Sequence, residues 1–246
     1  MTTYIAEIAG KDSIAAVHKV MREHSADFII PTIVYTGTEY GDLSTYARSI
    51  DYLVDCGKRY GVSIGETVIL HDEILWNHIC VRYQNQLFSK YSFFTPCIMC
   101  HLFTHLLRVP LYLQQNGSGI ITGERYSHNG KLKADQQHDT IRCFRTLFSS
   151  YGIPLIQPFI DVEDTNVIDK EICDYSYFSN INDVQCILSG NMTGYVLSDR
   201  EYLYRLKQYL DTFIEPVGQY LLQCYTRNEQ IQYKELDMII EGCFHE

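Results

Sequence analysis

The sequence lacks long hydrophobic runs, although hydrophobic residues make up 46% of its 246 positions. No stretch approaches the roughly 18 uninterrupted apolar residues of a membrane-spanning helix, so we expect no such helix. Residues Met1 to Glu7 place no basic region before an apolar run and therefore do not resemble a secretion signal. These absences predict a cytoplasmic protein. The hydrophobic share predicts a packed core, and the length suits one large domain or one domain with a helical appendage.

Basic residues are also scarce, since 20 Lys and Arg stand against 30 Asp and Glu and the formal net charge is -10. This balance argues against a protein whose whole surface binds nucleic acid, although it leaves room for a local basic groove. In a reducing compartment, the nine cysteines are expected to be buried small hydrophobes, metal ligands or reactive thiols rather than a disulfide framework.

Strand and helix patterns alternate along the chain. Short apolar runs at residues 3–9, 28–35, 67–71, 119–122 and 154–159 predict strands, and helical patterns at 13–24, 42–60 and 97–115 lie between them. Pro31 counts against a regular central strand, and Pro110 predicts a kink or break in its helix. This order predicts an α/β fold with a doubly wound parallel sheet and helices on both of its faces.

The pattern changes beyond Asp199, where residues 201–223 and 231–243 look helical. We therefore divide the chain into a sheet domain of residues 1–198 and a C-terminal helical extension of residues 199–246. The extension is expected to pack on the sheet domain or on a second subunit, and we expect a homodimer.

The first chemical signal is the junction between the first strand and its helix, Ile8-Ala9-Gly10-Lys11-Asp12-Ser13. A helix N-terminus presents free N–H groups and the positive end of a dipole, which together favour a phosphate. Gly10 permits close approach of the backbone, and the side chains of Lys11 and Ser13 can add charge and a hydrogen bond. The same residues also suit an ordinary turn in which Asp12 or Ser13 caps the helix.

The second signal is Pro96-Cys97-Ile98-Met99-Cys100. The two-residue gap lets both thiols reach one metal ion or cluster, or react with one another. A place near a helix N-terminus predicts a lowered thiol pKa for Cys97. Two buried core cysteines are the alternative. A zinc site normally uses a second such pair, which the sequence lacks, so the candidates for a third ligand are Cys143, Cys173 and Cys186.

The third signal is the polar loop that follows the strand at residues 119–122. It begins Thr122-Gly123-Glu124-Arg125 and continues through His128 and Lys131. Cationic side chains there can neutralise a phosphate, although a solvated surface loop is the plain alternative. Two such loops at the carboxyl ends of strands favour a binding site more than either loop alone.

Taken in order, these segments resemble the PP-loop ATP pyrophosphatases of the adenine nucleotide alpha-hydrolase superfamily. Ala9 to Ser13 is similar to their loop Ser-Gly-Gly-x-Asp-Ser, and Thr122-Gly123 to their Thr-Gly after the fourth strand. The Pro96–Cys100 segment, followed by Arg108, resembles the paired cysteines of the tRNA-thiolating members.

The likeness continues towards the C-terminus. Residues 156–162, leading into a helix through Glu163 and Glu171, resemble the Arg-Pro-Leu strand and helix of these enzymes, and Cys186 stands where they carry a further cysteine. Ile8 and Ala9 depart from the pattern, because they replace the first Ser and the first Gly of the loop. The loop after Gly123 is longer than the usual His-Asn-x-Asp-Asp, although His128-Asn129 partly matches it.

The resemblance implies an ATP-dependent sulfurtransferase. Such enzymes transfer AMP to a carbonyl oxygen, release pyrophosphate and replace the adenylated oxygen by sulfur. The implied ATP-binding residues are Ala9, Gly10, Lys11, Asp12, Ser13, Tyr35, Thr36 and Gly123, with Mg2+ bridging the phosphates and Tyr35 and Thr36 near the adenine. The implied catalytic residues are Asp12, Arg125, Cys97 and Cys186, of which Arg125 stabilises phosphate charge.

The resemblance also implies a sulfur-carrying site. Cys97, Cys100 and Cys186 would hold a 4Fe-4S cluster that carries sulfide at its open iron, or Cys97 and Cys186 would act as a persulfide and its resolving thiol. A cysteine desulfurase-like protein is the expected sulfur donor. The substrate is a free nucleobase-like heterocycle or, alternatively, a tRNA base. Two other hypotheses are an amide-forming ligase that uses ammonia and a nucleotide-binding module without catalysis.

Overall fold

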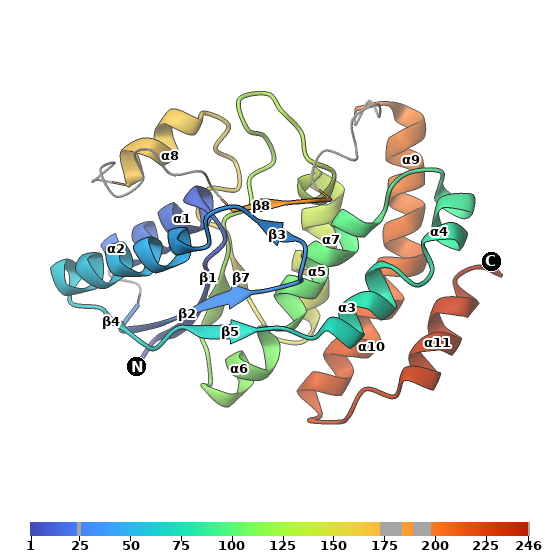
Figure 1. The fold of residues 1–246 in the computed structure, drawn as a ribbon, viewed down its shortest axis with the longest axis horizontal. Coiled ribbons are helices and arrows are strands. Elements are labelled where there is room, and N and C mark those ends of the chain that lie inside the picture. Colours follow the sequence, from blue (N-terminus) through green and yellow to red (C-terminus); the bar gives the residue numbers. More distant parts are fainter. Residues whose placement is uncertain (24–25, 173–183, 189–197, 246) are drawn as a thin grey trace.

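The computed structural model describes residues 1–23, 26–172, 184–188 and 198–245. At its centre is a six-stranded sheet in the order β4-β2-β1-β6-β7, with β5 also paired to β2 (Figure 1). Its strands are β1 (Thr3–Glu7), β2 (Phe28–Val34), β4 (Ser63–Ile64), β5 (Val68–Leu70), β6 (Gly119–Ile121) and β7 (Leu155–Ile156). All of these pairings are parallel and helices cover both faces, so the predicted α/β class is confirmed.

Neighbouring residues of the central strands enter two different hydrophobic cores. Ile5 and Ile30 face one core, whereas Ala6 and Ile29, next to them in sequence, face the other. Side chains alternate between the two faces of a strand, so a strand covered on both faces needs apolar residues at most of its positions. This requirement explains the continuous apolar runs in the sequence.

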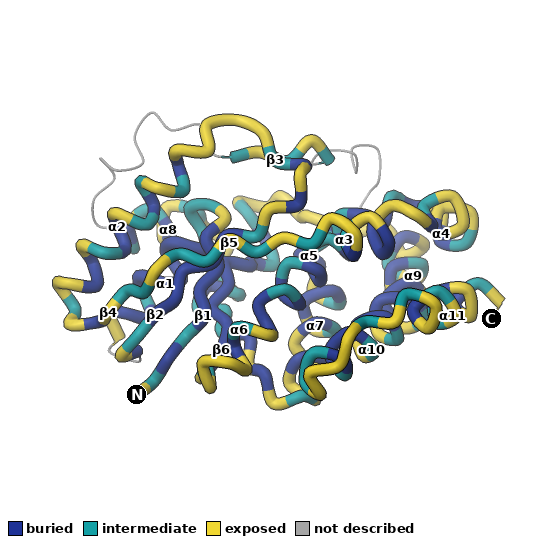
Figure 2. Tube along the Cα trace, turned by 60° about the horizontal axis from the view of Figure 1, so that its bottom comes forward, coloured by how far each residue is buried: buried dark blue, intermediate teal, exposed yellow. Residues whose placement is uncertain are grey.

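The helices divide between these two cores (Figure 1). On one face lie α1 (Lys11–Arg22), α2 (Ser44–Tyr60) and α8 (Thr165–Glu171). On the other lie α3 (Glu73–Cys80), α4 (Gln84–Tyr91), α5 (Pro96–Leu106), α6 (Val109–Gln114), α7 (His138–Ser150) and the C-terminal helices α9 (Arg200–Tyr209), α10 (Glu215–Thr226) and α11 (Tyr233–Gly242). Figure 2 shows the central strands buried and much of the outer surface of α2 and α11 exposed.

The C-terminal helices share a core with the sheet. Tyr209 packs edge-on against Tyr91 and Phe93, and Leu206 and Leu221 are fully buried in the same cluster. A π-helical turn at Leu210–Ile214 joins α9 to α10 just before Pro216, which has no N–H for a regular helical bond. The boundary at residue 198 and the homodimer both stay predictions.

Both prolines behave as their chemistry requires. The Ile29 carbonyl accepts a hydrogen bond from Gly65, next to β4, and the Tyr35 N–H donates to Leu70 in β5. Pro31 is an even number of residues from both, so its nitrogen faces the same side of β2. The outer strand is interrupted there between Ile64 and Val68, so the missing N–H leaves no ladder bond unmade. Pro110 stands at the start of α6, which confirms the predicted break.

The carboxyl ends of β1 and β6 meet at a topological switch point. The two strands are adjacent, but α1 follows β1 on one face of the sheet and α7 follows β6 on the other. Ligands of open parallel sheets bind where the connections diverge in this way. The loops with the first and third chemical signals of the sequence both begin at this point.

A separate two-stranded sheet was not predicted. β3 (Glu39–Tyr40) pairs antiparallel with β8 (Gln185–Cys186), so that Glu39 lies opposite Cys186. The pair attaches the segment around Cys186 to the loop that follows β2 (Figure 1). None of the helices in the described part of the chain combines the length and apolar character needed to cross a membrane.

Candidate functional site

The β1–α1 turn packs directly against the loop that follows β6. A Cβ atom placed on Gly123 would lie 2.4 Å from the Ser13 nitrogen and 2.7 Å from the Asp12 carbonyl carbon. Only a residue without a side chain permits this approach. Gly123 and the predicted phosphate loop are therefore in contact, as two parts of one site must be.

The Ser13 side chain shapes the turn from within. Its Oγ accepts hydrogen bonds from the Ala9 and Gly10 N–H groups, at 3.0 and 3.1 Å, and donates to the Gly10 carbonyl at 2.7 Å. The Lys11 ammonium forms an ion pair with Asp169 of α8. Contact of either side chain with a phosphate, which the sequence predicts, would need these bonds to be exchanged.

Asp12 and Arg125 form an ion pair across the switch point. Nε and Nη2 of Arg125 lie 3.2 Å from Asp12 Oδ2, and the Arg125 side chain is 2% exposed. His128 Nδ1 lies 2.8 Å from Arg125 Nη2 and 3.3 Å from the Asp12 carboxylate. Burial raises the pKa of Asp12, but the hydrogen bond with His128 and the charge of Arg125 outweigh it, so that this pKa lies below its ordinary value.

The loop after β2 is held by a carboxylate. Glu39 accepts hydrogen bonds from the Thr36 N–H at 3.0 Å, from the Thr36 hydroxyl at 2.7 Å and from the Gly37 N–H at 2.9 Å. Tyr35 is 41% exposed, and its N–H donates to Leu70 in β5. Tyr35 and Thr36 thus lie at the same sheet edge as the β1–α1 turn, and their contact with adenine stays a prediction.

Cys97 and Cys186 lie on either side of one backbone segment. The Cys97 thiol donates to the Leu188 carbonyl at 3.7 Å, and the Leu188 N–H donates to Cys186 Sγ at 3.4 Å. The Thr38 hydroxyl lies 3.1 Å from the same Cys186 sulfur. The fold therefore brings together two thiols that are 89 residues apart in the sequence. It does so through the β3–β8 pair, which no sequence pattern indicated.

Cys100 lies one turn further along α5 in a different setting. It accepts a hydrogen bond from the indole N–H of Trp76 at 3.2 Å. The hydrogen bond with the buried thiol of Cys80, followed by that with Trp76, lowers the pKa of Cys100 despite burial. Cys97 behaves in the opposite way, because burial and then the charge of Asp135 raise its pKa to about 12. The expectation that the helix dipole lowers the Cys97 pKa is therefore wrong.

The other two candidates for a third ligand are Cys143 and Cys173. Cys143 lies on α7 and lines a hollow of about 260 Å³ together with Asp139, Lys207 and Asp211, away from the residues around Cys97. Cys173 lies outside the described residues. Of the two candidates within the described residues, Cys143 and Cys186, the structure places Cys186 beside Cys97.

A short 3-10 turn at Ala134–Gln136 connects the thiol-bearing helix α5 with the loop of the ion pair. Asp135 lies 2.9 Å from His101 of α5, one turn after Cys97. The next residue, Gln136, accepts from the Arg125 N–H at 3.4 Å and lies 2.6 Å from His128 Nε2. The thiol-bearing helix and the loop of Arg125 thus contact adjacent residues of one turn.

Two buried polar clusters at this edge were missed by the sequence analysis. In the first, Glu7 lies 3.5 Å from Arg108, whose Nε donates to the Thr32 hydroxyl at 2.8 Å, and the Glu7 carboxylate accepts from the Gly123 N–H at 3.3 Å. Arg108 is 1% exposed and links β1 and β2 through Glu7 and Thr32. A basic residue among the apolar residues Leu106, Leu107 and Val109, between α5 and α6, was the available signal.

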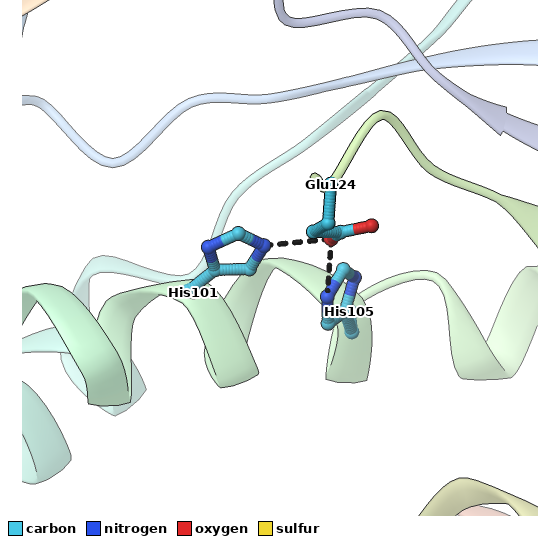
Figure 3. A group of neighbouring side chains, drawn as sticks. All are labelled: His101, His105 and Glu124. Carbon is cyan, nitrogen blue, oxygen red and sulfur yellow. Dashed lines mark hydrogen bonds and ion pairs between the residues drawn. The ribbon is translucent and has the colours of Figure 1, made fainter. Parts of the chain in front are cut away.

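The second cluster consists of His101, His105 and Glu124 (Figure 3). Both His101 Nε2 and His105 Nε2 lie close to Glu124 Oε1, at 2.7 and 2.9 Å. Burial lowers the pKa of His101, but the hydrogen bonds to Asp135 and Glu124 outweigh it and hold this pKa well above its ordinary value. The spacing of the two histidines, which places them on one helix face, was the signal available in the sequence.

Comparison with known proteins finds one curated relative and several solved structures, one of which is described here. The chain is 29% identical over 227 residues to the uncharacterized protein MJ0009 of Methanocaldococcus jannaschii, covering 89% of this chain and 79% of that protein. Among solved structures, it matches a U34-tRNA thiolase, NcsA of Methanococcus maripaludis with its [4Fe-4S] cluster, with a TM-score of 0.43 and 13% identity over 94% of this chain and 74% of that one. No protein-family model matches the sequence.

Proposed function

We propose that this protein is an ATP-dependent sulfurtransferase, which adenylates a carbonyl oxygen of a nucleobase-like heterocycle and replaces that oxygen by sulfur. The supporting observation is the meeting of two chemistries at one sheet edge. The β1–α1 turn and the Asp12–Arg125 pair lie at the switch point, and Arg125 contacts the turn at Ala134–Gln136, which also contacts His101 on the helix that carries Cys97. Cys186 lies beside Cys97 across Leu188. An adenylating centre and a sulfur-carrying centre need this proximity, because the activated carbon must be reached by the sulfur.

On this proposal, ATP phosphates bind the N-terminal N–H groups of α1, where the turn is open because no atom lies within 4 Å of a Cβ placed on Gly10. Arg125 leaves its pairing with Asp12 in part and stabilises charge on the phosphates during transfer. Asp12, whose pKa is lowered, is a carboxylate at neutral pH and is suited to a Mg2+ ion that bridges the phosphates.

The thiols suit a sulfur carrier. Cys97, Cys100 and Cys186 are three cysteines on two segments, and three cysteine ligands leave one iron of a 4Fe-4S cluster open for sulfide. A persulfide on Cys97 needs a thiolate at this position, but burial raises the Cys97 pKa to about 12. We therefore favour the cluster, because iron deprotonates a ligating thiol directly.

The substrate class follows from charge and chemistry. Exchange of oxygen for sulfur needs an amide-like carbonyl, as found in nucleobase rings. We propose a free heterocycle as the substrate because the chain carries only 20 basic residues. Thiolation of a tRNA base is the alternative, and a local basic groove would suffice for it.

The test is anaerobic purification with analysis of iron and sulfide, followed by mass spectrometry of a panel of bases and unmodified tRNA incubated with ATP and sulfide. The proposal predicts iron in the protein, a thiolated base, and one pyrophosphate for each product. Cys97→Ala and Cys186→Ala should abolish the product, whereas the matched control Cys143→Ala on α7 should retain it.

Two results would favour the other hypotheses. Amidated product with ammonia, unaffected by Cys97→Ala and Cys186→Ala, would indicate an amide-forming ligase. ATP binding without pyrophosphate release for every base and tRNA tested would indicate a binding module, consistent with Ile8 and Ala9 replacing two loop residues of the resembling family.

A further inference from the structure

The cluster of His101, His105 and Glu124 has the composition of a metal site. Its ligand atoms all lie within 4.8 Å of one another, and it is the one group in the described ranges that meets this criterion. His101 and His105 are four residues apart on α5, so their rings project from the same helix face towards Glu124 (Figure 3). Two imidazoles and one carboxylate are a ligand set that zinc and other divalent transition metals use.

The surroundings of the cluster orient each ligand. Nδ1 of His101 lies 2.9 Å from Asp135 Oδ2, so its second ring nitrogen is fixed by a carboxylate, as is usual for metal-binding histidines. The second carboxylate oxygen of Glu124, Oε2, accepts hydrogen bonds from Gln157 Nε2 at 3.0 Å and from the Thr122 hydroxyl. These contacts direct Glu124 Oε1 at the two imidazoles.

His105 gives the second, independent observation. Its side chain is 0% exposed, and neither of its ring nitrogens makes a hydrogen bond within the described part of the chain. Nε2 faces Glu124 at 2.9 Å without the geometry of a hydrogen bond. A buried ring nitrogen without a hydrogen bond carries a desolvation penalty, and coordination of a metal ion would remove this penalty for Nε2.

We propose that His101, His105 and Glu124 bind one divalent transition-metal ion, with Zn2+ the best match to the ligand set. Tetrahedral bonds of about 2.1 Å separate neighbouring ligand atoms by about 3.4 Å. The two Nε2–Oε1 distances must therefore widen by about 0.5 to 0.7 Å from 2.7 and 2.9 Å, which is within the reach of small side-chain rotations. The ion takes the place of the proton between His101 and Glu124.

The proposed metal site contains none of the thiols, and its expected role is structural. It joins α5, which carries Cys97 and Cys100, to the loop that carries Arg125 next to Glu124. Glu124 and His105 are 2% and 0% exposed, so the ion would be buried, and water would complete the fourth position that three protein ligands leave open. The ion would thus hold the two halves of the candidate site in register.

The experiment measures Co2+ and Zn2+ binding to the full-length protein by equilibrium dialysis and, for Co2+, by absorption spectroscopy. The variants are His105→Gln and Glu124→Gln, with Asp135→Asn to test the orientation of His101. The matched control is His78→Gln, which removes another buried histidine, one that pairs with Asp237 at 2.8 Å. Circular dichroism and urea unfolding establish that each variant is folded.

We expect one tightly bound ion per chain. The affinity should fall about 10- to 100-fold in Asp135→Asn and by more in His105→Gln and Glu124→Gln, and it should be unchanged in His78→Gln. The Co2+ spectrum should show d–d bands without the near-ultraviolet charge-transfer band of a cobalt–thiolate bond. This spectrum is recorded on the wild-type protein and decides the ligand type even if a variant does not fold.

Three outcomes would overturn the proposal: no binding to the wild type, unchanged affinity in both ligand variants, or a thiolate band that accounts for the bound cobalt. The first would identify the cluster as a buried network of protonated imidazole and carboxylate. No ATP, sulfide or base enters these measurements, so their failure is distinct from failure of the proposed sulfurtransferase.

Discussion

Replacement of Gly123 by alanine tests the contact between the two loops of the candidate site. The added Cβ would lie 2.4 Å from the Ser13 nitrogen, whereas an ordinary contact begins near 3.4 Å. The β1–α1 turn and the β6 loop must therefore separate by about 1 Å. Both partners are backbone, so no side-chain rotation relieves the clash. Overpacking of this kind destabilises a protein by about 3 kcal/mol at the upper end of its ordinary range.

Gly123→Ala should affect turnover and ATP affinity more than it affects the free energy of unfolding. A displacement of about 1 Å of catalytic groups slows an enzyme about 100-fold. Loss of one charge-assisted hydrogen bond to a phosphate contributes about 1.5 to 3 kcal/mol, so ATP affinity should fall about tenfold or more. Urea unfolding measures the first effect and isothermal titration with ATP the second.

Two other glycines provide matched controls. Gly10 is extended, with φ of −176°, and a Cβ placed on it meets no atom within 4 Å, so Gly10→Ala should preserve the unfolding free energy while hindering phosphate approach. Gly242 at the end of α11 is equally open, so Gly242→Ala should change neither property. Wild-type stability and ATP affinity in Gly123→Ala would refute the described contact of the two loops.

Three further predictions concern charge and sulfur. The pKa of Asp12 is lowered in the fold, so the stabilisation from its partners is complete above pH ~4 and is lost as the pH falls through the folded-state pKa; acid unfolding of Asp12→Asn should lack this loss. Arg108→Met leaves the Glu7 carboxylate at the sheet edge without its ion pair and should lower the unfolding free energy by about 3 to 5 kcal/mol in urea, and a change below ~1 kcal/mol would contradict this. Trp76 is the single tryptophan and donates to Cys100 Sγ, so reconstitution with iron and sulfide should quench its fluorescence, and undiminished emission would argue against Cys100 as a ligand.

The sheet was predictable because its strands are buried on both faces. Most positions of β1 and β2 carry apolar side chains, which leaves a run that sequence inspection detects directly. The shared location of Gly123 and the phosphate-loop turn was also predictable. Each follows the end of a parallel strand, and the carboxyl ends of parallel strands lie at one edge of the sheet. The two prolines likewise lie where a missing N–H is tolerated.

The contacts between side chains of the candidate site were harder to predict from the sequence. The Cys97–Cys186 meeting depends on β3 and β8, two-residue strands with no periodicity to detect. The Cys97 pKa was predicted in the wrong direction, because burial and neighbouring Asp135 outweigh the helix dipole and neither is visible locally in the sequence. Glu124 looked like a polar loop residue, whereas tertiary contacts with His101 and His105 bury it completely.

The most direct test of the account follows the oxygen atom of the substrate. A heterocycle labelled with 18O at its carbonyl would be incubated with the protein, ATP and sulfide, and the AMP produced would be analysed by mass spectrometry. Adenylation of that oxygen predicts one 18O atom in each AMP, together with an unlabelled thiolated base. Label found in water instead, or ATP converted to ADP and phosphate, would contradict an adenylating sulfurtransferase.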